Sequence, residues 1–250
     1  MTTTHSAFTR VLGFGYALTA YLGFLASFGY FILRTMGYVE RWDIGAGVSL
    51  SPWGALAFNA LLVAGFVVQH SIMARPSFKH RLAHVLPPAL ERATFVWAAN
   101  VALALASYFW ATSPSEAWNV WSVETPLLGW ALWTLGLLGW LGVAGASLFI
   151  DHFELFGLRQ AYTWATKREF KAKDFRTPGA YRIVRHPMML SMLVGLWACE
   201  SMNGVRLMLA SFMTAYVFFG IWARGTRPAL LRSALSIATT NGAFRRSYPV

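Results

Sequence analysis

The sequence predicts an all-α, polytopic integral membrane protein with five to six transmembrane helices. Of its 250 residues, 56% are apolar and only 12% are charged, and the mean hydropathy is +0.47. A soluble domain carries roughly 25% charged residues. Apolar stretches of about the 20 residues that a helix needs to cross a bilayer recur along the chain. The composition therefore excludes disordered, fibrous and disulfide-linked classes, the last because Cys199 is the single cysteine.

Six stretches have the length and polarity of membrane helices. They are 8–33, 53–73, 93–112, 127–150, 188–202 and 207–222. The last two are joined by Asn203, Gly204 and their neighbours, which predicts a tight helical hairpin over 188–222. We expect a single membrane domain over 1–250 that ends in a basic tail, 223–250.

The basic residues separate sharply between the two sides of these spans. With six spans, 18 of the 21 Lys and Arg fall on the side of the N-terminus, and only Arg34, Arg41 and Arg206 fall on the other. The positive-inside rule then places both termini and the two basic loops in the cytoplasm. The net charge of +11 also suggests nucleic-acid binding. Topology and contact with anionic lipid explain that charge, and no nucleic-acid motif accompanies it, so we expect the bilayer and no nucleic acid as a partner.

The fourth stretch carries a glycine at every third position. These glycines are Gly136, Gly139, Gly142 and Gly145. Small residues at such spacing are typical of a helix that packs closely against another in a membrane. We interpret the stripe as a packing face.

The cytoplasmic segment 151–187 is the longest and most polar connection, and its end has the features of an anion site. Pro187 suits the first turn of a helix, where its missing N–H costs nothing. Arg185 and His186 then lie beside free backbone N–H groups at a helix N-terminus, which attract a carboxylate or phosphate. Both residues suit a plain interfacial anchor equally well, so two interpretations remain open.

The run Arg185-His186-Pro187-Met188-Met189-Leu190-Ser191 resembles the Arg-His-Pro-x-Tyr-x-Gly motif of the isoprenylcysteine carboxyl methyltransferase superfamily. Four upstream blocks, in order, resemble the bacterial methanethiol S-methyltransferases within it: 69–79, 91–96, 151–160 and 175–178. The resemblance covers roughly residues 50–222. It implies an integral membrane enzyme that transfers a methyl group from S-adenosylmethionine to methanethiol, giving dimethyl sulfide, with a cytoplasmic cofactor site beside the C-terminal hairpin.

The same resemblance implies which residues bind the cofactor: Tyr181, Arg185, His186, Pro187 and Met189. Arg159 and Arg176 are weaker candidates for holding a carboxylate. No metal site is expected.

The chain departs from the family pattern in two places. Met189 and Ser191 replace the tyrosine and glycine of the motif, and the added serine side chain crowds a close backbone approach. After the last span, relatives carry acidic residues that help to hold the cofactor, in a block like Glu-Glu-Arg-Asp-Leu. This chain has no Asp or Glu after Glu200. The tail around 225–231 is open to interpretation as a frameshifted family terminus, because one codon choice for it reads Glu-Arg-Asp-Leu when shifted by one base.

Methyl transfer to a thiol requires removal of its proton, since the thiolate is the nucleophile. Candidate catalytic groups are His70 at the cytoplasmic end of the second span, and Asp151 and His152 at the end of the fourth, with Glu154 following. Ionisable groups at membrane depth are functional candidates by default, although each of these also suits a structural role at the boundary. The substrate would be a small apolar thiol held in a dry pocket between helices.

Two other functions remain open. The acceptor in the same superfamily would be another small thiol or a prenylcysteine carboxylate. Alternatively, the chain is a non-catalytic membrane protein that retains the fold after losing its acidic terminus. The sequence does not define an oligomeric state.

Overall fold

The computed structural model describes residues 6–113, 118–170 and 186–240, without the side chains of Ile150 and 223–240. It divides into two units, Met1–Leu209 and Ala210–Val250, and each is described by itself. Five described helices are long and apolar enough to cross a membrane. They are α1 (Ala7–Thr35), α3 (Pro52–Met73), α5 (Glu91–Tyr108), α6 (Pro126–Ile150) and the first part of α10 (Gly204–Thr240). The predicted all-α membrane architecture is confirmed.

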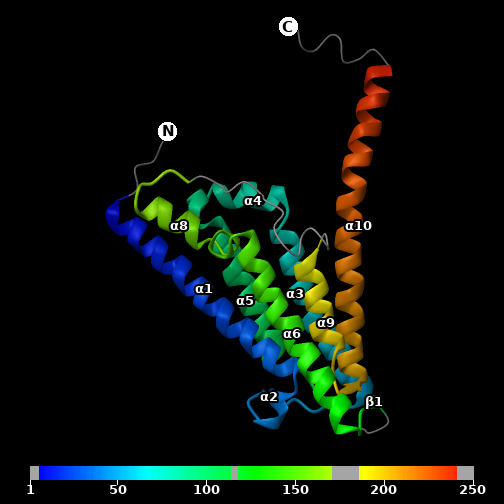
Figure 1. Cartoon of the computed structure of the whole chain (residues 1–250). Helices are drawn as coiled ribbons and strands as arrows, with labels where there is room; N and C mark the ends of the chain where they lie inside the picture. The colour runs from blue at the N-terminus through cyan, green and yellow to red at the C-terminus, as the bar shows by residue number, and fades with distance from the viewer. Residues whose placement is uncertain (1–5, 114–117, 171–185, 241–250) are drawn as a thin grey trace. The chain divides into compact units, whose positions relative to one another are not determined.

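Shorter elements connect these helices. They are α2 (Tyr38–Arg41), α4 (Pro76–Ala83), η1 (Pro88–Leu90), α7 (His152–Leu155), α8 (Leu158–Ala165) and α9 (Pro187–Trp197), with two strands, β1 (Asn119–Ser122) and β2 (Ser201–Asn203). Within the first unit, α4 and α8 lie at one end and α2 and β1 at the other (Figure 1). The helix ends that carry His70 and His152 belong to the α4 and α8 end.

The core nearest to that end joins α1, α5 and α8. Its buried members are small or aliphatic: Ala17, Ala20, Leu90, Ala93, Val96 and Ala161. Asn100 ties α5 to α1, because its Nδ2 donates to the Ala20 carbonyl at 2.8 Å. The small side chains allow the helices to approach closely. The polar amide of Asn100 finds its hydrogen-bond partner inside the bundle, because lipid offers none.

A second buried asparagine lies at the opposite end. Asn59 of α3 is fully buried, its Nδ2 donates to the Ala111 carbonyl at 2.8 Å, and its Oδ1 accepts from the Ala111 N–H at 2.8 Å. Helix α5 has already ended at Tyr108, so Ala111 has no helical partner for either group. One side chain therefore satisfies both backbone groups of a residue beyond the helix end.

The glycine stripe of α6 packs against α9, as the sequence predicts for three of its four members. A Cβ on Gly136 would lie 2.6 Å from the Ala198 carbonyl oxygen, one on Gly139 would meet the Gly195 backbone, and one on Gly142 would lie 2.6 Å from Ser191 Oγ. A Cβ on Gly145 would meet nothing within 4 Å. Facing glycine thus accommodates the serine that replaces the family glycine at Ser191.

These contacts fix the register of the antiparallel pair. Gly136 faces Ala198, Gly139 faces Gly195, and Gly142 faces Ser191, so three residues forward on α6 correspond to three or four residues back on α9. One further turn brings Pro187, the first residue of α9, level with Gly145 and Ala146 of α6. Pro187, the last residue of the Arg-His-Pro motif, therefore lies near the C-terminal end of α6.

The expected fifth span is shorter than the sequence predicts, and the hairpin connection is different. Helix α9 has 11 residues, about 16 Å at 1.5 Å per residue, against a hydrocarbon core of about 30 Å. Beyond Trp197 the chain becomes extended, and β2 pairs antiparallel with β1, with Ser122 opposite Ser201. A strand therefore separates α9 from α10, where we expected a tight turn.

The extended stretch after α9 lies alongside the first turns of α6, where lipid cannot satisfy free backbone groups. Its carbonyls have partners from the β1 region. Trp121 Nε1 donates to the Cys199 carbonyl at 3.3 Å, and the Val123 N–H donates to the Glu200 carbonyl at 2.9 Å. These bonds explain why the helix ends before Met202 although the sequence remains largely apolar.

The second unit contains the rest of α10, which continues as helix to Thr240. Its apolar part ends at Trp222. Residues 223–240 of the predicted basic tail are therefore helical, and residues 241–250 lie outside the described residues.

Candidate functional site

His152 is held by hydrogen bonds at both ring nitrogens. Nε2 lies 2.8 Å from the Tyr21 hydroxyl of α1, and Nδ1 lies 2.7 Å from Ser147 Oγ of α6. Ser147 Oγ also donates to the Ala144 carbonyl at 2.6 Å, and a carbonyl can only accept. The serine therefore accepts from the Nδ1–H of His152, and Nε2 of the neutral ring accepts from Tyr21.

Burial lowers the pKa of His152 from its ordinary value, and the neighbouring Asp151 carboxylate opposes that effect more weakly. Burial acts in this direction because it disfavours the charged imidazolium. The ring of Tyr21 lies 5.5 Å from that of His152, and the ring of Phe156 lies 4.9 Å from it. His152 is therefore a neutral ring at pH 7, enclosed by aromatic side chains.

Asp151 makes the corner between α6 and α7. Its φ of 85° is left-handed, a region that non-glycine residues rarely adopt. Its Oδ1 accepts from the Glu154 N–H at 3.2 Å and caps α7, and its Oδ2 lies 2.7 Å from Arg159 Nη1. The Arg159 guanidinium also pairs with the Glu154 carboxylate at 3.0 Å. This network holds the strained corner and uses one nitrogen of Arg159, our weaker candidate for a cofactor carboxylate.

His70 has a different environment in the last turn of α3. Its ring lies 5.5 Å from that of Phe66, one turn earlier, and 5.0 Å from that of Phe95 on α5. Its Nδ1 is buried without a hydrogen-bond partner. Phe95 and Phe156 pack against the same buried core, so the two histidine clusters flank one cluster of small residues.

The described part of the Arg-His-Pro motif begins at His186. His186 is the N-cap of α9, makes no side-chain capping hydrogen bond, and precedes the buried Pro187. Met189 is half-buried on the first turn. The other predicted cofactor residues, Tyr181 and Arg185, lie outside the described residues, as does Arg176.

No group of three or more potential metal ligands forms in the described ranges. His80 and His84 make a ring contact at 5.0 Å on α4, without a carboxylate or thiolate to complete a site.

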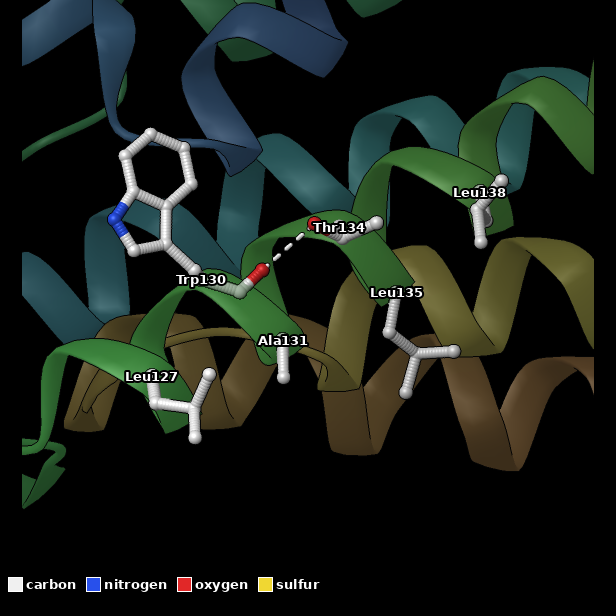
Figure 2. Close-up of a pocket in the computed structure, with 6 residues that line it drawn as sticks. All are labelled: Leu127, Trp130, Ala131, Thr134, Leu135 and Leu138. Carbon is white, nitrogen blue, oxygen red and sulfur yellow. Dashed lines mark hydrogen bonds between the residues drawn. The ribbon is translucent and has the colours of Figure 1, made fainter.

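A shallow apolar groove lies elsewhere, along the N-terminal half of α6. Its lining consists of Leu127, Trp130, Ala131, Thr134, Leu135 and Leu138. All six come from one helix, and Thr134 Oγ donates to the Trp130 carbonyl at 2.7 Å (Figure 2). Leu127 is 81% exposed. A surface so apolar and exposed suits contact with lipid, and it contains none of the predicted site residues.

Sequence reasoning missed Tyr21, Ser147, Phe66 and Phe95. Only Phe66 carried a usable signal, because it lies four residues before His70 and so shares its face of the helix. Tyr21 lies 131 positions from His152 in the sequence, and no local pattern connects them.

No protein-family model matches the chain, and no solved structure matches it. Methanethiol S-methyltransferase 2 of Bradyrhizobium diazoefficiens is 36% identical over 86% of this chain and 81% of its own length. Methanethiol S-methyltransferase of Mycobacterium tuberculosis is 37% identical over 85% of this chain and 86% of its own. Nurim of Xenopus laevis is 32% identical over 61% of this chain and 55% of its own.

The first two relatives match most of both chains at well over 30% identity, across the spans and the segments that carry His70, Asp151 and His152. The chain therefore belongs to the methanethiol S-methyltransferase family of integral membrane proteins.

Proposed function

We propose that the protein methylates methanethiol to dimethyl sulfide, with S-adenosylmethionine as the methyl donor and its active site at the cytoplasmic face. The observation that carries the proposal is the extent of similarity to two methanethiol S-methyltransferases, over four-fifths or more of each relative. Several buried or half-buried polar groups at one end of the helices support it: His70, His152, Asp151 and the uncapped start of α9.

The residues present fit such a donor. A helix N-terminus that no side chain caps favours a carboxylate, which the donor carries. We assign the cofactor to Tyr181, Arg185, His186, Pro187 and Met189, with His186 and Pro187 at the N-terminus of α9. When bound, the donor supplies an activated methyl group on a positive sulfonium.

The protein's own contribution is to position the thiol, exclude water and remove a proton. Methyl transfer is an in-line displacement, so holding the reacting atoms in line lowers the barrier without covalent help from the protein. An alkanethiol is less acidic than cysteine, whose pKa is about 8.5, so a base raises the fraction of thiolate. His70, Asp151 and His152 are the groups proposed for this task. A small apolar acceptor requires only a small pocket between helices.

The test is measurement of dimethyl sulfide in the headspace of cells or membranes given methanethiol. We expect production by this chain, and increased production by a version whose tail is replaced by Glu-Arg-Asp-Leu from residue 226. The sequence of the gene tests the frameshift interpretation independently. Methylation of a prenylcysteine with no dimethyl sulfide would contradict the assigned acceptor.

A binding measurement separates the enzyme from a non-catalytic protein of the same fold. We expect S-adenosylmethionine to bind purified protein, and to bind an Arg185→Ala/His186→Ala variant more weakly. Equally weak binding to both would favour the non-catalytic alternative.

A further inference from the structure

We infer that His70, and neither His152 nor Asp151, accepts the proton of the thiol, in a pocket formed with Phe66 and Phe95. The inference rests on the proposed function and names the acceptor site within it. His152 and Asp151 already make structural interactions with other side chains, whereas Nδ1 of His70 is buried without a partner.

Two of the three groups proposed as the base, His152 and Asp151, are already engaged in structural interactions. The neutral ring of His152 donates from Nδ1 to Ser147 and accepts at Nε2 from Tyr21, at 2.7 and 2.8 Å. The Asp151 carboxylate is 8% exposed, caps α7 through Oδ1 and is paired with Arg159 through Oδ2. His152 would have to break its hydrogen bond with Tyr21 before Nε2 could accept a proton from a substrate. Protonation of Asp151 would remove the negative charge that pairs with Arg159 and would weaken that ion pair.

His70 has the opposite character. Its Nδ1 is buried and has no hydrogen-bond partner. Buried polar atoms almost always have partners, so an orphaned one requires an explanation. Lys79 of α4 and Glu91 of α5, on the two elements that pack against α3 at this end, are paired with each other at 3.0 Å. An imidazole with a free lone pair is the group that a thiol S–H can meet.

The surroundings of His70 suit a small sulfur compound. The rings of Phe66 and Phe95 lie 5.5 and 5.0 Å from the imidazole, and sulfur packs favourably at about 5 Å from aromatic rings. One residue earlier, Gln69 Nε2 donates to Met73 Sδ at 3.1 Å, while its Oε1 is buried without a partner. This turn of α3 therefore carries two buried polar atoms that no described side chain satisfies.

The proton balance is simple. The S–H bond of the thiol breaks, its proton passes to His70 Nδ1, and the sulfur keeps the electron pair. That pair forms the new bond to the methyl carbon as the bond from carbon to the sulfonium breaks, which leaves two neutral sulfides. His70 then releases its proton to water at the cytoplasmic interface, since α3 ends three residues later at Met73.

The decisive experiment compares two acceptors that differ in acidity. His70→Gln keeps a polar side chain of similar size but removes the base. We expect kcat/KM for methanethiol to fall about 100-fold at neutral pH, within the usual range for general-base catalysis. A fluorinated ethanethiol is much more acidic, so a substantial share of it ionises near neutral pH without help, and it should lose less than about threefold. The loss with methanethiol should shrink as pH rises and the free thiol ionises.

His84→Gln is the matched control. His84 is an exposed histidine on the same side of the protein, at the end of α4, and its replacement should leave both rates unchanged. His152→Gln should lower the two rates by the same factor, because its effect is on the structure of the site. Equal losses with both thiols for His70→Gln, or selective rescue of His152→Gln by the acidic thiol, would overturn the inference.

A second measurement does not depend on turnover. Carbethoxylation of histidines, located by mass spectrometry in the wild-type protein, reports access to each ring. We expect dimethyl sulfide to slow modification of His70 and to leave His84 unaffected; no protection of His70 would contradict the pocket. If the wild-type chain makes no dimethyl sulfide although His70 is protected, the proposed function fails while the pocket stands.

Discussion

Replacement of Gly139 by alanine is the sharpest test of how α9 is held. The new Cβ would lie 2.8 Å from the Ser191 carbonyl oxygen and 2.9 Å from Gly195 Cα, with the Gly195 nitrogen closer still. Carbon contacts are optimal at about 3.5–4.0 Å, so α9 must move away by roughly 1 Å. These atoms are backbone, and no side-chain rotation can relieve the contact.

Gly145→Ala is the matched control on the same helix. A Cβ there would meet nothing within 4 Å. Both variants gain the same helix propensity, about 1 kcal/mol for alanine over glycine, so that contribution cancels in their difference. The remaining difference is the cost of overpacking, about 1–3 kcal/mol. We expect the upper end for Gly139→Ala because the opposing atoms are backbone.

The assay is thermal unfolding in detergent micelles or nanodiscs, followed by tryptophan fluorescence, together with binding of S-adenosylmethionine. For a chain of this size, about 3 kcal/mol corresponds to a midpoint roughly 6–12 °C lower than that of Gly145→Ala. Cofactor binding should also weaken, because α9 carries His186 at its start. Equal midpoints for the two alanine variants would refute the packing register of α6 and α9.

Three further predictions follow from the same structure. Gly142→Ala should be rescued by Ser191→Gly, because the added Cβ meets only the Ser191 side chain; additive losses in a double-mutant cycle of thermal midpoints would contradict this. Asn59→Ala should lower the free energy of unfolding by about 2–4 kcal/mol, measured by reversible unfolding, since it leaves two buried backbone groups unpaired; an unchanged value would show that water replaces the amide. Burial lowers the pKa of His152, so below pH 6.5 the unfolded chain binds a proton at this ring more readily than the folded chain does. The free energy of unfolding should therefore fall as pH drops below 6.5. His152→Gln should flatten that dependence, measured as midpoints above and below this pH.

The spans could be predicted from the sequence because apolar length alone determines them. Helices α3 and α6 begin within one residue of the starts expected for the second and fourth spans. Both have proline in the first turn. The sequence also predicted that the glycine stripe of α6 packs against another helix, although not that this helix is α9. The end of α9 could not be predicted, because it depends on the β1 strand, which lies some 80 residues earlier and is too short to have a pattern of its own.

The candidate site could be predicted from the sequence only in part. His70 and His152 look alike in the sequence, because each lies at the end of an apolar stretch. Their difference depends largely on side chains from other helices. Tyr21 and Ser147 bond both ring nitrogens of His152, whereas the rings of Phe66 and Phe95 lie beside His70. Hydrogen-bond partners across such distances leave no trace in local spacing.

The pairing of β1 with β2 has a consequence for the order in which the chain assembles during synthesis. Helices α1, α3 and α5 can pack together as soon as they have entered the bilayer. Helix α6 must wait, because its glycine face is matched only by α9, and the sheet that closes the pair requires Asn203. Until the ribosome has passed that residue, the glycine face of α6 is covered by lipid or by the insertion machinery. Delayed or failed synthesis of the last quarter of the chain, which contains α9 and β2, would therefore leave α6 inserted but without its packing partner.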